Sequence, residues 1–160
     1  MVTIFKLKGF TLVELMVTIA IAAILITVGM PSLTSLYEAY RSDSEIRKAQ
    51  QVLMFARNQA ISYGLDVTVC PLGSSSNSCG TNWIKGITVI YDNAGTNESL
   101  KIINEFNSQD SLTFASTSIV FSPDGLASTS GTMTYCPGGS SSSNCKSIQL
   151  SSSGRVNMPD

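Results

Sequence analysis

The first half of the chain passes from an unbroken apolar run to an amphipathic pattern. Nearly every residue from Phe10 to Met30 is apolar, and a helix of 21 residues extends roughly 31 Å, about the hydrocarbon thickness of a bilayer. Beyond Pro31, one buried helical stripe is predicted by spacings of three and four. It comprises Ala49, Val52, Leu53, Ala56, Ala60 and Tyr63. We therefore expect one long helix that bends near Pro31 and stops at Gly64.

Polar residues define the other side of the second helical segment. Arg47, Lys48, Gln51 and Arg57 fall mostly away from the buried stripe. Such residues are typical of a solvated helix face. Arg57 is accordingly assigned to solvent rather than to any site.

From Asp66 onward, short apolar stretches alternate with Ser, Gly, Asn and Asp. Strands are expected at 67–71, 83–91, 100–106, 119–121, 132–136, 147–151 and 155–158. Turns are expected at 92–95, 123–125 and 153–154. Consecutive strands without intervening helices favour antiparallel pairing. The predicted fold class is α+β, a long N-terminal helix packed on one or two small antiparallel sheets, with the lone Trp83 in the core.

Composition and charge argue against catalysis. The chain of 160 residues has 10 basic and 11 acidic residues and no histidine. The absence of histidine removes Ser/His/Asp and Cys/His nucleophile systems and leaves few acid–base groups that titrate near neutral pH. No polybasic tract is present. We expect neither an enzyme nor a cofactor.

The four cysteines lie in two similar segments, VTVCPLGSSSNSCG and MTYCPGGSSSSNCK. Four cysteines allow three pairings, and the parallel spacing favours Cys70 with Cys79 and Cys136 with Cys145. Each bond would stabilise the fold by roughly 2.5 kcal/mol in the loop-entropy model. A zinc site is the alternative, but neither pair has the ligand spacing of common structural sites, so no metal is expected. The serine runs between the cysteines are interpreted as flexible loops, with display to a partner as the alternative.

The flanks of the apolar run predict its orientation. Lys6 and Lys8 precede the run, and no basic residue follows it until Arg41, so the N-terminal end should stay in the cytoplasm and the rest of the chain outside. A cleaved secretory signal fits poorly, because its small-residue site, Ala20-Ile21-Ala22, lies within the run. A plain signal anchor does not explain the charge of Glu14.

The stretch KGFTLVEL resembles the prepilin cleavage motif of type IV pilins and type II secretion pseudopilins. The resemblance implies cleavage between Gly9 and Phe10 by a prepilin peptidase, methylation of the new Phe10 amine, and an assembly role for Glu14. A carboxylate is tolerated in an apolar bundle when a cation meets it, and the freed amine of a neighbouring subunit would be that cation. The alternative is a carboxylate that only reaches toward the membrane interface.

This resemblance divides the chain into four expected segments. They are a leader peptide at 1–9, a transmembrane and filament-core helix at 10–31, an amphipathic helix at 32–64, and a β domain with two disulfide loops at 65–160. The mature chain would carry 8 basic and 11 acidic residues. Its formal charge would be −3.

Further segments resemble the GspH/FimT family of type IV minor pilins and pseudopilins. They are VTVCP, NWIKGITVIYDNAG, FSPDG, TYC and IQLSSSGRV, and the cysteines resemble the FimT and FimU branch. The resemblance implies a minor pilin that helps to start pilus assembly with the other minor pilins and the major pilin, near the filament tip. It also implies a single-pass inner-membrane protein with a periplasmic C-terminal domain before assembly, and a place in the surface filament afterwards.

Two other functions remain open for this family. Some FimT-type pilins bind double-stranded DNA during natural transformation through a C-terminal Gly-Arg-x-Arg motif; the matching positions here are Gly154, Arg155, Val156 and Asn157, so the second arginine is missing. Lys146 and Arg155 are the candidate DNA contacts, with Lys85 or Lys101 as additions. For Arg155, the simpler interpretation is an exposed turn residue. The third candidate is a type II secretion pseudopilin of the same fold.

Overall fold

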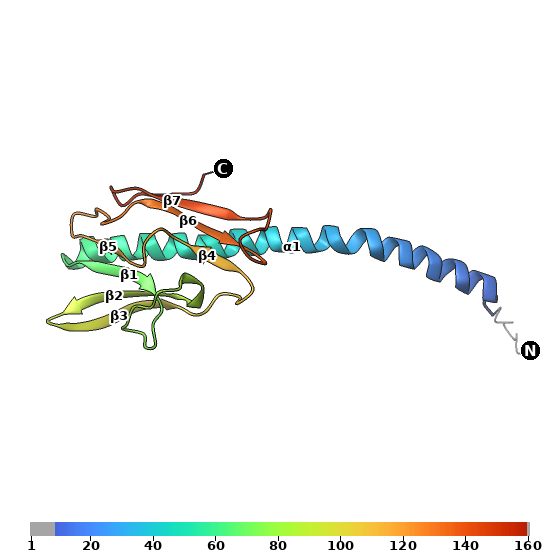
Figure 1. Ribbon diagram of the computed structural model, residues 1–160, viewed down its shortest axis with the longest axis horizontal. Helices are drawn as coiled ribbons and strands as arrows, with labels where there is room; N and C mark the ends of the chain where they lie inside the picture. Colours follow the sequence, from blue (N-terminus) through green and yellow to red (C-terminus); the bar gives the residue numbers. More distant parts are fainter. Residues whose placement is uncertain (1–8, 160) are drawn as a thin grey trace, which may run out of the picture. The chain divides into compact units, whose positions relative to one another are not determined.

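A computed structural model describes residues 9–159, which belong to two compact units that divide after Tyr37. Helix α1 (Leu12–Tyr63) contributes to both units (Figure 1). Its backbone stays helical across Gly29-Met30-Pro31, so this segment does not end the helix. Gly64 ends it as predicted, with a positive φ of 68° and an amide that donates to the Ala60 carbonyl at 3.0 Å.

The second unit contains two four-stranded sheets, and every strand pairing in them is antiparallel. The first sheet has the order β3-β2-β1-β5, with β1 (Val67–Pro71), β2 (Ile87–Asn93), β3 (Thr96–Ile103) and β5 (Ile119–Phe121). The second has the order β4-β6-β7-β8, with β4 (Ser111–Thr113), β6 (Gly131–Cys136), β7 (Lys146–Leu150) and β8 (Val156–Asn157). The predicted α+β class, with a long helix on small antiparallel sheets, is confirmed.

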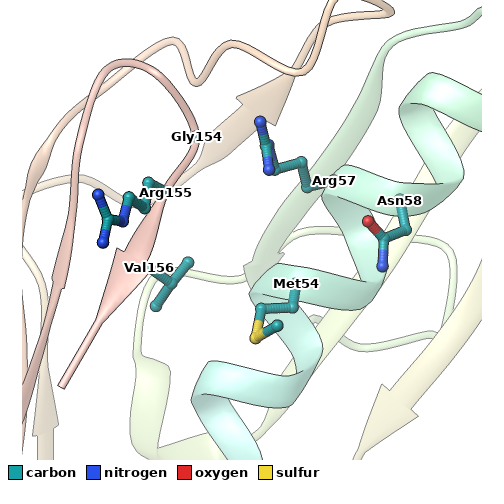
Figure 2. A pocket seen from close by; sticks show the side chains of 6 residues that line it. All are labelled: Met54, Arg57, Asn58, Gly154, Arg155 and Val156. Carbon is teal, nitrogen blue, oxygen red and sulfur yellow. The ribbon is translucent and has the colours of Figure 1, made fainter.

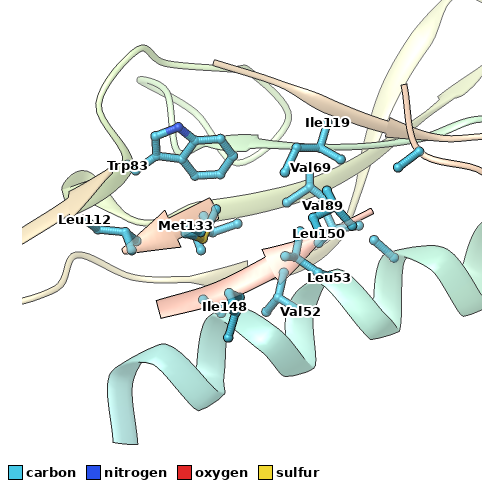
Figure 3. Close-up of a cluster of buried hydrophobic side chains, with 14 of the residues drawn as sticks. Val52, Leu53, Val69, Trp83, Val89, Leu112, Ile119, Met133, Ile148 and Leu150 are labelled. Carbon is cyan, nitrogen blue, oxygen red and sulfur yellow. The ribbon is translucent and has the colours of Figure 1, made fainter. Parts of the chain in front are cut away.

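One core joins the C-terminal half of α1 to both sheets. Ala49, Ala56 and Ala60 are fully buried on the helix, where their small side chains allow strands to approach closely. Figure 3 shows Val52 and Leu53 of α1 facing this cluster. The strands contribute, among others, Val69, Val89, Ile119, Met133, Ile148 and Leu150. The predicted stripe is therefore the buried face of the helix, except for Tyr63, which is 52% exposed.

Three elements differ from the prediction. Trp83–Lys85 forms the 3-10 helix η1 rather than the start of a strand, because the Asn82 side chain accepts from the Ile84 amide at 3.2 Å and caps it. Strand β3 starts earlier than expected, since a two-residue turn at Ala94-Gly95 joins it directly to β2. The three-residue β4 was not predicted. Trp83 is in the core, as expected, and its indole donates to the Ser116 carbonyl at 2.9 Å.

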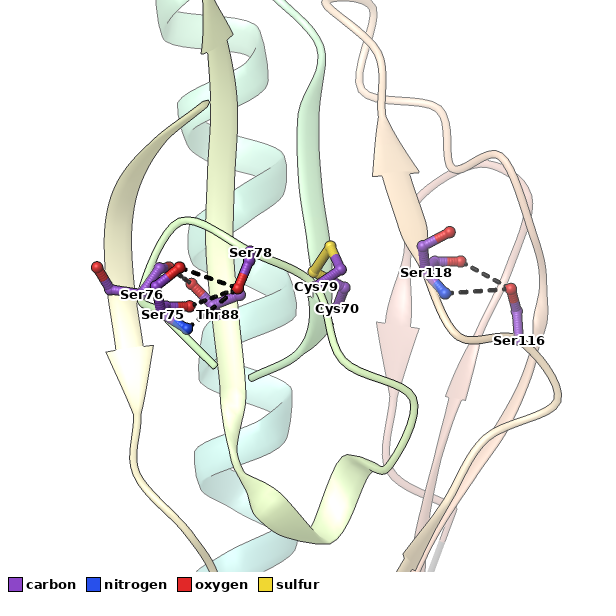
Figure 4. The surroundings of a disulfide bond; sticks show 8 residues. All are labelled: Cys70, Ser75, Ser76, Ser78, Cys79, Thr88, Ser116 and Ser118. Carbon is purple, nitrogen blue, oxygen red and sulfur yellow. Dashed lines mark hydrogen bonds between the residues drawn. A yellow bond between two sulfur atoms is a disulfide. The ribbon is translucent and has the colours of Figure 1, made fainter. Parts of the chain in front are cut away.

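Both local disulfides are present in the structure, Cys70–Cys79 and Cys136–Cys145. The first closes a loop whose residues are hydrogen-bonded to one another and to Thr88 of β2 (Figure 4). The Thr88 hydroxyl donates to the Ser76 carbonyl at 2.6 Å, and Ser75 and Ser78 are hydrogen-bonded to each other. Since all four cysteines are in disulfides, they cannot supply thiolates to a metal.

Candidate functional site

The N-terminus of α1 has a capping box. Thr11 precedes the helix, its hydroxyl accepts from the Glu14 amide at 3.2 Å, and the Glu14 carboxylate accepts from the Thr11 amide at 3.1 Å. This reciprocal arrangement satisfies two backbone donors that a helix start leaves free. Glu14 thus has an intrachain role that the sequence analysis missed, although the pattern T-x-x-E could have revealed it. Gly9 and Phe10 lie just before the helix, exposed and outside regular structure.

The first unit exposes a continuous apolar surface. Those of its large hydrophobic side chains between Phe10 and Leu36 that the structure describes are each 52–83% exposed. An 18-residue window of α1 has a mean hydropathy of 2.4, and the helix is long and apolar enough to cross a membrane. Glu14 is the acidic residue in this surface. Such a surface is stable only within lipid or against other apolar helices.

A cavity of about 130 Å³ lies within the second unit between α1 and the chain that leads into β8. Figure 2 shows its lining. We call it the α1–β8 cleft, and its residues are Met54, Arg57, Asn58, Gly154, Arg155 and Val156. Gly154 and Arg155 are the motif positions noted in the sequence, and the structure places them beside Met54, Arg57 and Asn58 of α1.

Arg57 does not belong to a simple solvated face, contrary to the prediction. Its Nε donates to the Gly125 carbonyl at 2.9 Å, and its Nη2 approaches the Ser153 carbonyl at 3.4 Å. The side chain therefore connects α1 to two turns, the one after β5 and the one before β8. Helical periodicity alone could not reveal this, because the acceptors are 68 and 96 residues away in the sequence.

The two candidate DNA contacts are separated. Lys146 is the first residue of β7, while Arg155 follows the turn at the other end of that strand. Four residue steps along a strand amount to roughly 13 Å. Arg155 is exposed, and its Nε donates to the Asn157 side chain at 3.1 Å. Asn157 stands where the Gly-Arg-x-Arg motif has its second arginine. In the α1–β8 cleft, the second arginine beside Arg155 is instead Arg57 of α1.

Four of the eight basic residues between positions 9 and 159 form ion pairs. Arg41, Arg47, Lys48 and Lys85 each form a salt bridge, the last of them to Glu105 at 2.6 Å. Lys101 lies 5.0 Å from the centroid of the Phe55 ring. Arg57 and Arg155 instead donate to uncharged oxygens. The α1–β8 cleft therefore has positive charge without an ion-paired carboxylate among the described contacts.

A buried ionic cluster holds the second disulfide loop. The Asp110 carboxylate accepts from the Arg41 guanidinium at 2.8 Å, from the Gly138 amide at 2.8 Å and from the Tyr135 hydroxyl. Burial, and then the hydrogen bond to Asp110, raises the pKa of Tyr135 above its ordinary value. These groups connect α1, β6 and the loop between Cys136 and Cys145, and their burial and mutual pairing are typical of a structural cluster.

Comparison with known proteins agrees with these features. Residues 45–154 match the family model described as Type II transport protein GspH, and residues 5–30 match the prokaryotic N-terminal methylation motif. No protein with a curated description matches the chain.

Two solved structures share its fold, both of the type IV minor pilin FimU from Pseudomonas aeruginosa. One, in space group P21, has 18% identity and a TM-score of 0.63, and the alignment covers 78% of this chain and 92% of that one. The other, in space group P65, has 19% identity and a TM-score of 0.59, with 74% and 92% covered. Because the family model spans more than half of the sequence, this chain belongs to the GspH family, and it shares the fold of the minor pilin FimU.

Proposed function

We propose that this protein is a minor pilin of a type IV pilus, incorporated near the filament tip, where it helps to start assembly with the other minor pilins and the major pilin. The observation that carries the proposal is the apolar surface between Phe10 and Leu36, whose described large hydrophobic side chains are all exposed and which has the Glu14 carboxylate near its start. A single chain cannot bury this surface, so the surface fits a membrane first and a bundle of like helices later.

Processing would take place just before α1. The Gly9–Phe10 peptide bond is exposed and lies outside the helix, so a prepilin peptidase could bind it in an extended form without unwinding regular structure. Cleavage would create a cationic amine at Phe10, four residues before Glu14. The apolar part of α1 would hold the chain in the inner membrane, with the β domain in the periplasm.

Assembly would use Glu14 twice. In the single chain, its carboxylate bonds to Thr11 and satisfies the helix start. In the filament, the methylated amine of an adjacent subunit would pair with the same carboxylate, which offers more acceptor sites than Thr11 uses. This pairing would set the axial position of one helix against the next.

The proposal is tested by the amount of this protein in sheared surface pili, measured by immunoblot against its amount in whole cells. We expect Glu14→Ala to remove it from the pilus fraction. Glu14→Gln is the matched control, because glutamine retains the capping box but not the charge. Equal loss in both variants supports the pairing, whereas normal incorporation of Glu14→Gln would reduce Glu14 to a helix cap. Recovery of the wild-type protein with secretion components rather than pili would favour a type II secretion pseudopilin.

DNA binding in natural transformation is the second candidate, and the observation that favours it is the position of Arg57 beside Gly154 and Arg155. Arg57, Arg155 and Lys146 supply few phosphate contacts, so we expect weak binding that decreases only moderately as the salt concentration rises. The test is a fluorescence titration of the full chain in detergent against double-stranded DNA. Loss of a salt-sensitive signal in Arg155→Gln, but not in Lys48→Gln, would support this function.

A further inference from the structure

The α1–β8 cleft lies within an exposed apolar surface. Met54 and Ile61, seven residues apart on one face of α1, are each 49% exposed, and Leu126 in the turn after β5 is 48% exposed. Ile61 lies near that turn, since its Cδ1 is 3.0 Å from the position that a β-carbon on Gly125 would occupy. The cleft and these neighbours thus combine exposed aliphatic side chains with methionine and arginine, two residue types that are enriched in protein interfaces.

Hydrogen bonds fix the shape of this surface. The Ala127 amide donates to the Ser152 carbonyl at 2.9 Å, which joins the chain after β5 to the turn before β8. Within that second turn, the Ser151 amide donates to the Arg155 carbonyl at 3.0 Å. Arg57 connects both turns to α1. A preformed surface of this kind loses little conformational entropy when a partner binds.

Its charge indicates what the partner must offer. Arg155 is exposed, and Arg57 is half-buried with its guanidinium against carbonyl oxygens. Neither forms a salt bridge with another residue that the structure describes. A carboxylate beside Arg155 would form a charge-assisted hydrogen bond, and an apolar side chain would fill the cavity between Met54 and Val156.

We propose that the α1–β8 cleft is a docking site for an adjacent pilin subunit that inserts an apolar side chain into the cavity and places a carboxylate against Arg155. This inference rests on the proposed function, because it needs a filament neighbour. A protein fits the cleft better than DNA does, since exposed apolar side chains give nothing to phosphate and only two cations line the cavity.

The test is site-specific photo-crosslinking of the full chain in pilus-producing cells. A photoreactive phenylalanine analogue replaces Met54 in one strain and Ile102 in another; Ile102 is 41% exposed on β3 and serves as the control. We expect the probe at position 54 to give a covalent product with another pilin, at roughly ten times the control yield. Mass spectrometry should place the cross-link beside an Asp or Glu of that subunit.

Charge reversal tests the second half of the proposal. We expect Arg155→Glu to lower the yield from position 54 by roughly tenfold, because like charges then meet. A partner variant with Lys in place of the mapped acidic residue should restore the yield. Failure of this restoration, or insensitivity to Arg155→Glu, would overturn the assigned contact.

The remaining outcomes distinguish a failure of the docking site from a failure of the proposed minor-pilin function. If the chain enters pili but position 54 gives no more product than position 102, the docking site is wrong and the minor-pilin function stands. If the wild-type chain is absent from pili, both fail. Nuclease-sensitive products at position 54 in place of a pilin product would assign the cleft to DNA.

Discussion

The Arg57 side chain lies directly against Gly154. Its Nε and Cδ are 2.8 and 3.1 Å from the position that a β-carbon at residue 154 would occupy, and the Gly125 carbonyl oxygen lies closer still. Gly154 also has a φ of 72°, a region that side chains other than glycine rarely adopt. The glycine of the C-terminal Gly-Arg pair is therefore explained by packing, because it allows two turns and α1 to meet.

Gly154→Ala should be among the most destabilising single substitutions in the second unit. Backbone strain and the collision with Gly125 together should cost roughly 2 to 3 kcal/mol. The measurement is urea unfolding of the full chain in detergent, followed by the fluorescence of Trp83, the single tryptophan. Gly95→Ala is the control, since its φ is 91° but nothing lies within 4 Å of the added β-carbon. Equal losses in the two variants would mean that strain alone matters.

Arg57→Met should release both turns while keeping the aliphatic part of the side chain. It leaves the buried Gly125 carbonyl without the arginine donor, which should cost about 1 to 3 kcal/mol. Hydrogen exchange should increase at the Gly154 amide, which donates to Ser151 within one of the released turns. Arg47→Met is the matched control: among the described residues, the ion pair of Arg47 is with Asp43 at the surface, so this variant should change neither observable. Unchanged exchange in Arg57→Met would show that the turns are held by their own hydrogen bonds.

The bounds of β1 and β5 match the sequence prediction because these stretches are rich in β-branched residues and lie between turn residues. The helical stripe was predicted for a similar reason, since its period of 3.6 is a local property of the sequence. Such patterns identify which residues are buried. They do not identify which distant turns lie against a helix.

The errors at Trp83–Lys85 and Arg57 share this cause. An asparagine cap changed an apolar stretch into η1, and a polar residue off the stripe proved to connect turns from two sheets. Both depend on side-chain contacts that periodicity does not describe. The capping box of Thr11 and Glu14, by contrast, is visible in the sequence as the pattern T-x-x-E, whereas the sequence prediction for Glu14 was an assembly contact or a carboxylate at the membrane interface.

The hydroxyl of Tyr135 should ionise only when the protein unfolds. Its pKa is raised in the folded state by burial and by the bond to Asp110, whereas the unfolded chain has the ordinary value of 10.0. The folded state then holds the phenol proton more tightly than the unfolded state does. The free energy of unfolding should therefore not depend on this group below about pH 10. Above pH 10 it should decrease by about 1.4 kcal/mol per pH unit. A phenolate absorbance titration in parallel with Trp83 fluorescence measures both events.

In Tyr135→Phe, the free energy of unfolding should decrease less steeply with pH above the ordinary pKa of tyrosine. Tyr40→Phe is the control, because Tyr40 is 72% exposed and its ionisation should not be linked to unfolding. An equally steep pH dependence in Tyr135→Phe would contradict the coupling and assign alkaline unfolding to other groups.

Asp110→Asn should be more damaging than any surface charge change. It removes the negative charge that faces Arg41 and the Tyr135 hydroxyl in a site where the Asp110 side chain has no exposed surface. Breaking one partner of a buried ion pair costs roughly 3 kcal/mol. Glu105→Gln is the control, since it breaks the exposed salt bridge to Lys85 and should leave unfolding unchanged. A small effect of Asp110→Asn would mean that the neutral amide satisfies the same donors.

The two disulfides should contribute similarly to stability but differently to local order. Each spans nine positions, so loop closure should contribute about 2.5 kcal/mol in each case. The Cys136→Ser/Cys145→Ser variant should also expose the Gly138 amide to hydrogen exchange, because the loop that presents it to Asp110 is then held by fewer constraints. The Cys70→Ser/Cys79→Ser variant is the matched control and should leave Gly138 protected. Protection of Gly138 in both variants would show that Asp110 holds the loop without the disulfide, and peptide mapping that joined Cys70 to Cys136 would contradict the local pairing itself.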